Sequence, residues 1–340
     1  MSAPRLSVII PTLNEANTLP QLLNQLDAQR KVTLEILIAD GGSIDETAAI
    51  ARARNARLIE IKQRGRGVQM NRAVAEAAGD ELLFLHADSG LPDPDLLPNA
   101  LAALDAQRAT HGDQVAGHFP VRFVDPPFEP PILMRWFAAK SHLNRPECIL
   151  GDRGMLLSRR FFQQLGPFSE ALPCLEDLDF SARVARNGLW ITLPGAIETS
   201  ARRFRQEGVW RRSFLNALIL TAWQADFHPF LAASPALYRA QHATRRLHIR
   251  PFLQLIHQLD QGERAPVVWK RWYRLTRSMR RSLFWQLFFL FDLLVTPLRP
   301  SKTHPVLSFY DHLLDPLLDW IPLDLLLTPL LRSISKHYSK

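Results

Sequence analysis

The sequence is poor in cysteine and lacks a long uninterrupted apolar segment. Its 340 residues include two cysteines, Cys148 and Cys174, which are too few for a disulfide framework or a cysteine-rich zinc site, so we expect a reducing cytoplasm. The apolar run near the N-terminus is too short for a signal peptide. The best candidate for a membrane span, residues 283–298, is shorter than the roughly 18–20 apolar residues required and contains Gln286 and Asp292. Internal repeats and low-complexity tracts are absent.

Charge is distributed unevenly along the chain. Residues 1–200 contain 20 Lys and Arg against 24 Asp and Glu, a net charge of −4, whereas residues 201–340 contain 21 against 9, a net charge of +12. A chain of this length is expected to form about two domains. The asymmetry suggests that the two parts have different tasks and that the basic part favours an anionic partner.

The N-terminal part predicts an α/β fold. Short apolar runs alternate with segments of helical spacing, and this alternation predicts a mostly parallel sheet with helices on both faces. The expected strands are residues 6–10, 34–39, 57–61 and 82–85, and the expected helices are residues 19–26, 47–54 and 69–78. Beyond a Pro-rich connection at residues 125–131 the alternation weakens, and we expect strands at residues 151–158 and 189–193 and a helix at residues 175–186.

Polar residues follow several of these strands. Asn14 and Glu15 follow the first strand, Asp40 ends the second, and residues 86–88 follow the fourth. In open α/β sheets, ligands bind at this edge. Asp40 could accept hydrogen bonds from a nucleobase or a ribose hydroxyl, or it could belong to a plain Asp-Gly turn that leads into a helix cap.

Three further charged groups fit phosphate or proton chemistry. Asp88, two residues after a histidine, suits a divalent cation that bridges a diphosphate, or it belongs to a surface turn. Asp177, or Glu176 before it, could remove a proton from an attacking hydroxyl, or both are acids favoured at a helix N-terminus. The cationic residues 63–67 and 202–203 could face phosphates or could be solvated surface.

The motifs PTxNE, DGGSxDxT, GRGxQMN, FLHADS and LEDLDF occur in this order, which resembles family-2 glycosyltransferases with the GT-A fold. The resemblance covers roughly residues 5–225. The GRGxQMN and LHAD forms look closest to the radical-SAM/selenodomain-associated transferase subgroup. We therefore expect a GT-A catalytic domain at residues 1–225, with a Rossmann-like sheet, and a basic amphipathic helical region at residues 226–340.

The resemblance implies an activity and a role for each matching residue. The enzyme would move a sugar from a nucleotide-diphosphate donor, by default a UDP-sugar, to an acceptor hydroxyl with inversion, assisted by Mn²⁺ or Mg²⁺. The implied base is Asp177, with Glu176 beside it, and the implied metal ligand is Asp88. The implied donor-nucleotide residues are Pro11, Thr12, Glu15, Asp40, Arg64, Arg66, Asn71 and Ala87, and those for the leaving diphosphate are Arg202 and Arg203.

His86 departs from the family pattern. It stands where most members have the first Asp of a DxD motif. Histidine can ligate manganese but is less suited to magnesium. His86 could instead contact the ribose or pack structurally, and both interpretations stay open from the sequence.

The basic C-terminal part suits a membrane surface. Arginine alternates with Trp and Phe on amphipathic segments, which is typical of peripheral attachment to an anionic bilayer. We expect the inner face of the cell membrane, where a lipid-linked acceptor would be within reach. Alternatively these segments pack on the catalytic domain or form a dimer interface. Nucleic-acid binding is not expected, because no recognised module accompanies the charge. The helical faces in question carry Lys270, Arg274, Arg277 and Arg281, and Asp311, Asp315 and Asp319.

Two other functions fit the same fold class. The first is a nucleotide-sugar-binding module without transfer activity, which the presence of both Asp88 and Asp177 disfavours. The second is a nucleotidyltransferase, which would typically need a Gly-rich basic loop directly after the first strand. This chain has PTLNE there, at residues 11–15, which disfavours that function.

Overall fold

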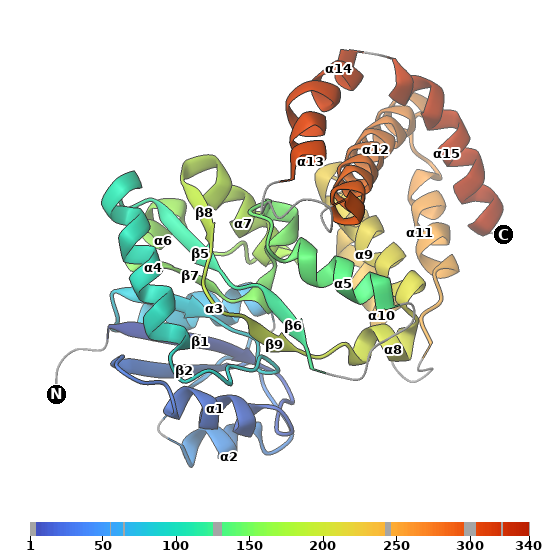
Figure 1. The fold of residues 1–340 in the computed structure, drawn as a ribbon. Helices are drawn as coiled ribbons and strands as arrows, with labels where there is room; N and C mark the ends of the chain where they lie inside the picture. Colours follow the sequence, from blue (N-terminus) through green and yellow to red (C-terminus); the bar gives the residue numbers. More distant parts are fainter. Residues whose placement is uncertain are drawn as a thin grey trace. The chain divides into compact units, whose positions relative to one another are not determined.

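The computed structural model describes residues 5–54, 56–63, 65–124, 131–241, 246–295, 304–320 and 322–339, with the backbone alone at residues 131 and 132. Arg64 and residues 125–130 of the expected Pro-rich connection therefore lie outside the described residues. The chain divides into two compact units, Met1–Arg202 and Arg203–Lys340 (Figure 1).

The first unit is built on a seven-stranded sheet in the order β3-β2-β1-β4-β7-β5-β8. Neighbouring strands are parallel, except that β7 runs antiparallel to both β4 and β5. This arrangement confirms the predicted mostly parallel sheet. The strands are β1 Leu6–Thr12, β2 Leu34–Asp40, β3 Arg57–Glu60, β4 Glu81–Phe84, β5 Val115–His118, β7 Met155–Ser158 and β8 Leu189–Thr192, and a separate parallel pair consists of β6 Val121–Phe123 and β9 Ile197–Thr199.

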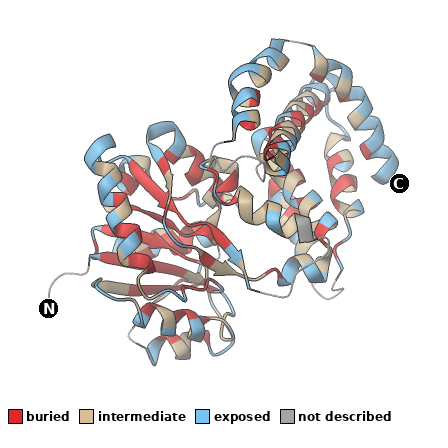
Figure 2. Cartoon of the chain, in the orientation of Figure 1, coloured by how far each residue is buried: buried red, intermediate tan, exposed pale blue. Residues whose placement is uncertain are grey.

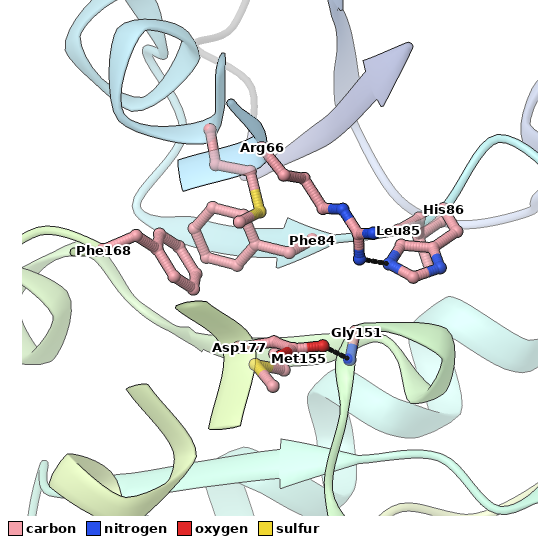
Figure 3. Close-up of a pocket in the computed structure, with 9 residues that line it drawn as sticks. Arg66, Phe84, Leu85, His86, Gly151, Met155, Phe168 and Asp177 are labelled. Carbon is pink, nitrogen blue, oxygen red and sulfur yellow. Dashed lines mark hydrogen bonds between the residues drawn. The ribbon is translucent and has the colours of Figure 1, made fainter. Parts of the chain in front are cut away.

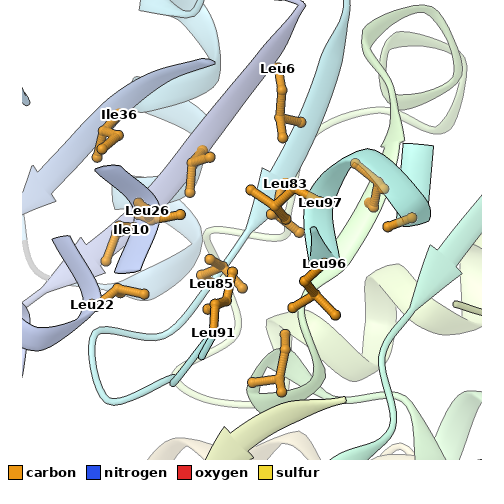
Figure 4. Packing of buried hydrophobic residues seen from close by; sticks show 14 of the residues in the cluster. Leu6, Ile10, Leu22, Leu26, Ile36, Leu83, Leu85, Leu91, Leu96 and Leu97 are labelled. Carbon is orange, nitrogen blue, oxygen red and sulfur yellow. The ribbon is translucent and has the colours of Figure 1, made fainter. Parts of the chain in front are cut away.

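Two apolar cores cover the two faces of the sheet, because successive side chains of its central strands point to opposite faces. Val8 and Ile10 of β1 pack in one core, with α1 and α4, whereas Ile9 packs in the other, with α3, α6 and α7. Figure 4 shows the first core, and Figure 2 shows the buried central strands of the sheet. The helices are α1 Leu19–Asp27, α2 Thr47–Arg52, α3 Arg66–Glu76, α4 Leu96–His111, α5 Pro131–Lys140, α6 Arg159–Leu165 and α7 Glu176–Asn187.

The predicted strand over residues 151–158 is wrong in its first half. Gly151–Arg153 forms a 3₁₀ turn, Gly154 follows with a φ of 61°, and the strand begins at Met155. The left-handed conformation at Gly154 interrupts the extended backbone. Because β7 is antiparallel to β4, with Met155 opposite Phe84, the 3₁₀ turn lies beside the carboxyl end of β4, at the ligand edge.

The second unit is helical, as the sequence predicted for the C-terminal part. Its core includes Phe230, Phe252 and Trp272. Among the described residues, no helix combines the length and the apolar character needed to cross a membrane. The helices are α8 Arg202–Glu207 at the junction of the units, α9 Val209–Gln224, α10 His228–Arg239, α11 Arg250–Asp260, α12 Ala265–Val295, α13 Pro305–Phe309, α14 Asp315–Trp320 and α15 Leu323–Ser339, with a π-helical segment at Tyr310–Leu314.

A buried arginine organises the C-terminal helices. The side chain of Arg280 on α12 is 1% exposed, and its Nε donates to Oδ1 of Asp324 at 2.7 Å while its Nη2 donates to Oδ1 of Asp319 at 3.0 Å. The neighbouring Arg281 pairs with Asp315 at 2.6 Å. Basic residues of α12 are therefore matched by aspartates of the following helices.

We expect Arg280→Met to destabilise the second unit, because it leaves buried carboxylates without their cation. Breaking one partner of a buried ion pair costs about 3–5 kcal/mol, whereas replacing both partners costs less. Urea unfolding followed by circular dichroism should show a larger loss for Arg280→Met than for Arg280→Met combined with Asp324→Leu. The control is Lys270→Met on the exposed side of the same helix. A loss for Arg280→Met no larger than that of the control would contradict this account.

Candidate active site

A pocket lies at the carboxyl edge of the sheet in the first unit. It brings together the start of α3, the end of β4, the 3₁₀ turn before β7 and the start of α7 (Figure 3). Polar Arg66, His86 and Asp177 share it with an apolar surface. The lining residues are Arg66, Met70, Phe84, Leu85, His86, Gly151, Met155, Phe168 and Asp177.

Arg66, the first residue of α3, is the cation of this pocket. Its Nη1 lies 3.0 Å from Nε2 of His86, and its Nε lies 3.3 Å from Oε1 of Glu176. A guanidinium has donors only, so Nε2 of His86 accepts this hydrogen bond and carries no proton. Burial lowers the pKa of Arg66, but neighbouring carboxylates raise it, and the net shift is upward. These carboxylates belong to Glu176, Asp177, Asp88 and Asp152.

Asp177 is held in place by two backbone donors. Its Oδ2 accepts a hydrogen bond from Gly151 N at 2.8 Å, and its Oδ1 accepts one from Leu178 N at 2.8 Å. Leu175, just before α7, has a φ of 66°. This conformation is uncommon for a leucine, and such strain is found preferentially at functional sites. The local backbone thus fixes the direction of the Asp177 carboxylate.

Glu176 has a different environment from its neighbour. It is 4% exposed and pairs with Arg66. Burial raises the pKa of Glu176, the charge of Arg66 opposes that shift, and the charge of Asp177 adds to it. The two adjacent acids are therefore not equivalent: Glu176 anchors the cation, and Asp177 lines the pocket.

Gly151 is required by the close approach of its neighbours. A Cβ at this position would lie 2.5 Å from Nε2 of His86 and 3.2 Å from Oδ2 of Asp177. Any side chain would therefore separate the Arg66–His86 pair from Asp177. The sequence-based prediction of a strand here gave no sign of this role.

Asp88 and Asp152 add negative charge near the pocket. Asp88 is exposed in the turn after β4. Burial raises the pKa of Asp152, Arg153 opposes the shift, and Asp177 and Asp88 reinforce it. Oδ1 of Asp152 is buried and has no hydrogen-bond partner among the described residues. Asp152 was not predicted as a site residue, because it lay inside the predicted strand.

The described parts of the chain contain no group of three or more His, Cys, Asp or Glu side chains that could hold a metal ion by themselves. A cation bound by one or two carboxylates takes its other ligands from phosphates and water. The acidic side chains beside the pocket, including the Asp152 oxygen that accepts no hydrogen bond among the described residues, fit an oxygen-liganded divalent cation of that kind.

Asp40 ends β2 and holds its own turn together. Its carboxylate accepts hydrogen bonds from Thr12 Oγ1 at 3.1 Å, from the backbone of Gly42 at 3.1 Å, and from Ser43 through N at 2.9 Å and Oγ at 2.5 Å. Asp40 is 4% exposed. These bonds match the interpretation of the DGGS motif as a plain turn. The binding of a nucleotide by Asp40 remains a prediction.

The loop after β1 is joined to the loop after β2. Asn14 has a φ of 58°. Its backbone N donates to Ser43 Oγ at 2.9 Å, and Ile44 N donates to Asn14 Oδ1 at 2.9 Å. Glu15 N donates to Thr47 Oγ1 at 2.8 Å. These bonds bring the first two motifs together at one edge, with Pro11 half-buried beside them.

Gln69 and Asn71 act on the backbone around the site. Nε2 of Gln69 donates to Thr12 O at 2.8 Å and to Ala39 O at 2.7 Å, which ties α3 to the ends of β1 and β2. Asn71 exchanges hydrogen bonds of 2.9 Å with the backbone of Phe168. Gln69 was missed by sequence reasoning, although a polar residue on an otherwise buried helical face is a usable signal.

The remaining predicted residues are placed as follows. Ala87 is 4% exposed and packs in the apolar core. Arg64 lies outside the described residues. Arg202, the last residue of the first unit, is exposed and is not among the residues that line the pocket. Arg203 is the first residue of the second unit and is also exposed.

Comparisons with known proteins agree with this architecture. The family described as Glycosyl transferase family 2 matches residues 7–166. A relative named PGL/p-HBAD biosynthesis glycosyltransferase, from Mycobacterium bovis and Mycobacterium tuberculosis, is 34% identical over 202 residues, which are 56% of this chain and 74% of that protein. The crystal structure of S. aureus TarS 1–349 in complex with UDP has a TM-score of 0.50 at 20% identity, and the match covers 90% of this chain and 86% of that chain.

The likeness to TarS is a likeness of fold, and with the observed sheet it confirms the predicted GT-A, Rossmann-like arrangement. The mycobacterial relative is matched over most of its length at 34% identity, and the family match contains the strands that form the pocket edge. The chain therefore belongs to glycosyl transferase family 2 and is a glycosyltransferase.

Proposed function

We propose that this glycosyltransferase moves a sugar from a nucleotide-diphosphate donor, by default a UDP-sugar, to an acceptor hydroxyl with inversion at the anomeric carbon. The observation that carries the proposal is Asp177, a carboxylate fixed by two backbone donors in a pocket that also holds Arg66. Solved TarS structures contain UDP or UDP-GlcNAc, which supports a nucleotide-sugar donor for a chain of this fold. Membership of the radical-SAM/selenodomain-associated subgroup stays a prediction.

Asp177 acts as the base of a single displacement. The acceptor hydroxyl gives its proton to the Asp177 carboxylate while its oxygen forms a bond to the anomeric carbon. The bond from that carbon to the diphosphate oxygen breaks, and its electron pair leaves with the nucleoside diphosphate. Arg66 offers hydrogen-bond donors to the developing negative charge.

The donor nucleotide binds along the ends of β1, β2 and β4. We assign Pro11, Thr12, Glu15 and Asp40 to the nucleoside, with Ala87 at the end of β4. The interlocked loops after β1 and β2 support a rigid nucleotide edge. By the family motif alone, Arg64 and Asn71 are assigned to the nucleotide or its diphosphate, and Arg202 and Arg203 to the leaving diphosphate.

Asp88 would hold a divalent cation, Mn²⁺ or Mg²⁺. The excess of carboxylates around Arg66 supports this assignment. When bound, such a cation neutralises charge on the leaving diphosphate. The lone pair on Nε2 of His86 is engaged by Arg66, which supports a ribose contact or a packing role for His86 over metal ligation.

Asp177→Asn should abolish turnover while donor binding persists, because the amide cannot take the acceptor proton. We expect a loss of about 10²–10⁴-fold in release of nucleoside diphosphate from a panel of nucleotide sugars, with donor affinity measured by calorimetry. Asp179→Asn on the same helix, where Asp179 pairs with Arg183, is the matched control. An Asp177→Asn variant with most of its activity would refute the base assignment. Pyrophosphate release would instead indicate a nucleotidyltransferase, and binding without release would indicate a binding module.

Asp88→Asn should remove the metal-dependent part of donor affinity. Donor binding to the wild type should weaken when EDTA is added, and Asp88→Asn should already be weak and insensitive to EDTA. Asp93→Asn, exposed in the same loop, should behave as wild type. Equal donor affinity of wild type and Asp88→Asn, with and without EDTA, would exclude the metal role.

We also propose that the second unit attaches to the cytoplasmic face of the cell membrane. In this proposal residues 1–225 form the catalytic domain and residues 226–340 form the region that attaches to the membrane. Arginines of α12 are paired with aspartates, so apolar contact supports the proposal better than charge alone. Along the second half of α12, every third or fourth residue has an exposed apolar side chain. These side chains form a row of the kind found on helices that lie at a membrane interface. These are Leu283, Leu287, Phe291 and Leu294, each 51–62% exposed.

Replacing Leu287 and Phe291 together by Gln should reduce flotation of the full chain with vesicles that contain anionic lipid, because the apolar row is interrupted at its centre. Ile44→Gln, at an exposed apolar residue of the first unit, is the control and should float normally. Unchanged flotation of the double variant would refute this surface. A loss of dimer in light scattering, without a change in flotation, would identify the row as an interface between copies.

A further inference from the structure

Arg153 is a buried cation whose hydrogen-bonding capacity is largely unused. Its side chain is 7% exposed, and its Nε and Nη1 are buried without a hydrogen-bond partner among the described residues. The carboxylate oxygen Oδ1 of Asp152 lies 3.8 Å from Nε, which is too long for a hydrogen bond. A buried charge that lacks hydrogen bonds is costly, and an anionic ligand would offset that cost.

Arg153 is fixed close to the proposed base. It ends the 3₁₀ turn whose Gly151 donates to Asp177. Its carbonyl accepts a hydrogen bond from Phe119 N at 2.9 Å, just beyond β5. Gly151 and Arg153 are two residues apart, and two residues of chain span at most about 7 Å. The backbone of Arg153 therefore lies within about 7 Å of the backbone of Gly151, which orients Asp177. The adjacent Asp152 side chain is 41% exposed.

The topology assigns Arg153 to the acceptor side of the site. The two nucleotide motifs follow β1 and β2, whereas Arg153 lies between β7 and β5. In the sheet order these strands are on the opposite side of β4 from β1 and β2. A molecule that reaches Asp177 from the Arg153 side therefore approaches from the edge that the nucleotide does not use.

Groups of both signs surround Arg153. Burial lowers the pKa of Lys140 at the end of α5, Cys148 opposes the shift, Arg153 lowers it further, and Glu147 and Asp152 raise it. The Nζ of Lys140 lies 4.6 Å from the ring centre of Trp136. His118 has a pKa of about 4, chiefly because of burial, with Arg153 contributing, so it is neutral near pH 7. Its Nε2 is hydrogen-bonded to Asn144 at 2.8 Å. Burial raises the pKa of Cys148 to about 11, so this thiol adds no negative charge.

We propose that Arg153 binds an oxyanion of the acceptor, either a phosphate or a carboxylate. The enzyme then glycosylates a hydroxyl on an acidic acceptor, and Arg153 positions that acceptor against Asp177. This inference rests on the proposed function, because it takes Asp177 as the base that receives the acceptor proton.

The test uses full-length protein saturated with UDP, so that the donor side is filled. Phenyl phosphate and benzoate are titrated as probes against neutral benzyl alcohol, with binding followed by ligand-observed NMR. We expect the two anions to bind and the alcohol not to bind, and Arg153→Met to weaken anion binding by about 10–100-fold. Arg153→Lys should retain part of the anion affinity, because lysine keeps the positive charge. The matched control is Arg145→Met, since Arg145 already pairs with Glu147 at 2.9 Å. Undiminished anion binding by Arg153→Met would overturn the proposal.

Thermal unfolding gives a second readout that needs no ligand. If Arg153 is kept for binding, Arg153→Met should leave the Tm unchanged or raise it, because a charge without hydrogen bonds is removed from the interior. A clear drop in Tm together with unchanged anion binding would make Arg153 a structural partner of Asp152 and end the proposal. Vesicles containing phosphatidic acid distinguish the sources: Arg153-dependent capture indicates a lipid phosphate, and Arg153-dependent binding of the soluble probes alone indicates a soluble acid.

Failure of this inference can be separated from failure of the proposed function. Arg153→Met should still bind UDP and should still release nucleoside diphosphate by slow donor hydrolysis. If those activities persist while anion binding is unaffected, the acceptor inference is wrong and the transferase assignment stands. If the wild type releases no nucleoside diphosphate but its anion binding depends on Arg153, the transferase assignment fails and the anion site stands.

Discussion

The candidate active site depends on one guanidinium among several carboxylates. Arg66 contacts His86 and Glu176 directly, and the charges of Asp177, Asp88 and Asp152 act on it. Carboxylates this close would repel one another without a cation between them. The Arg66 contacts also join α3, the end of β4 and the start of α7. The interaction that balances the charge therefore also holds these three walls of the pocket together. The site remains acidic overall, which is the setting in which a divalent cation can be held next to a diphosphate.

In the second unit, arginines are paired with aspartates of neighbouring helices. Its sequence suggests a broadly basic surface, but arginines on α12 are paired with aspartates: Arg271 with Asp260, Arg277 with Asp319, and Arg281 with Asp315. The buried Arg280 pairs with Asp324 and Asp319. These ion pairs hold helices together. The surface of α12 also carries an exposed apolar row, and that row is a feature that requires a partner.

Local pattern predicted the first half of the sheet because continuous apolar strands and amphipathic helices alternate there. The four early strands and the helices between them appear where their apolar periodicity placed them. The pattern failed where contacts are non-local. The strand β5 is short, and the antiparallel β7 is inserted between β4 and β5, a placement that no periodicity encodes. Gly151 and Asp152 reach the pocket only through this reversal, which is why neither was predicted to be part of it.

The sequence by itself determined the family, the α/β class and the residues of the ordered motifs, because turn glycines, strand-end acids and helix spacing are local properties of the chain. Tertiary structure alone decided how those residues are used. In the folded chain the Asp40 carboxylate accepts hydrogen bonds from its own turn, and His86 is hydrogen-bonded to Arg66. Gln69 donates hydrogen bonds to the ends of two neighbouring strands. The tertiary structure also left Nε and Nη1 of Arg153 buried without a hydrogen-bond partner among the described residues. The physical reason is that a hydrogen bond depends on which groups meet in space, and residues from distant parts of the chain meet only after the sheet has formed.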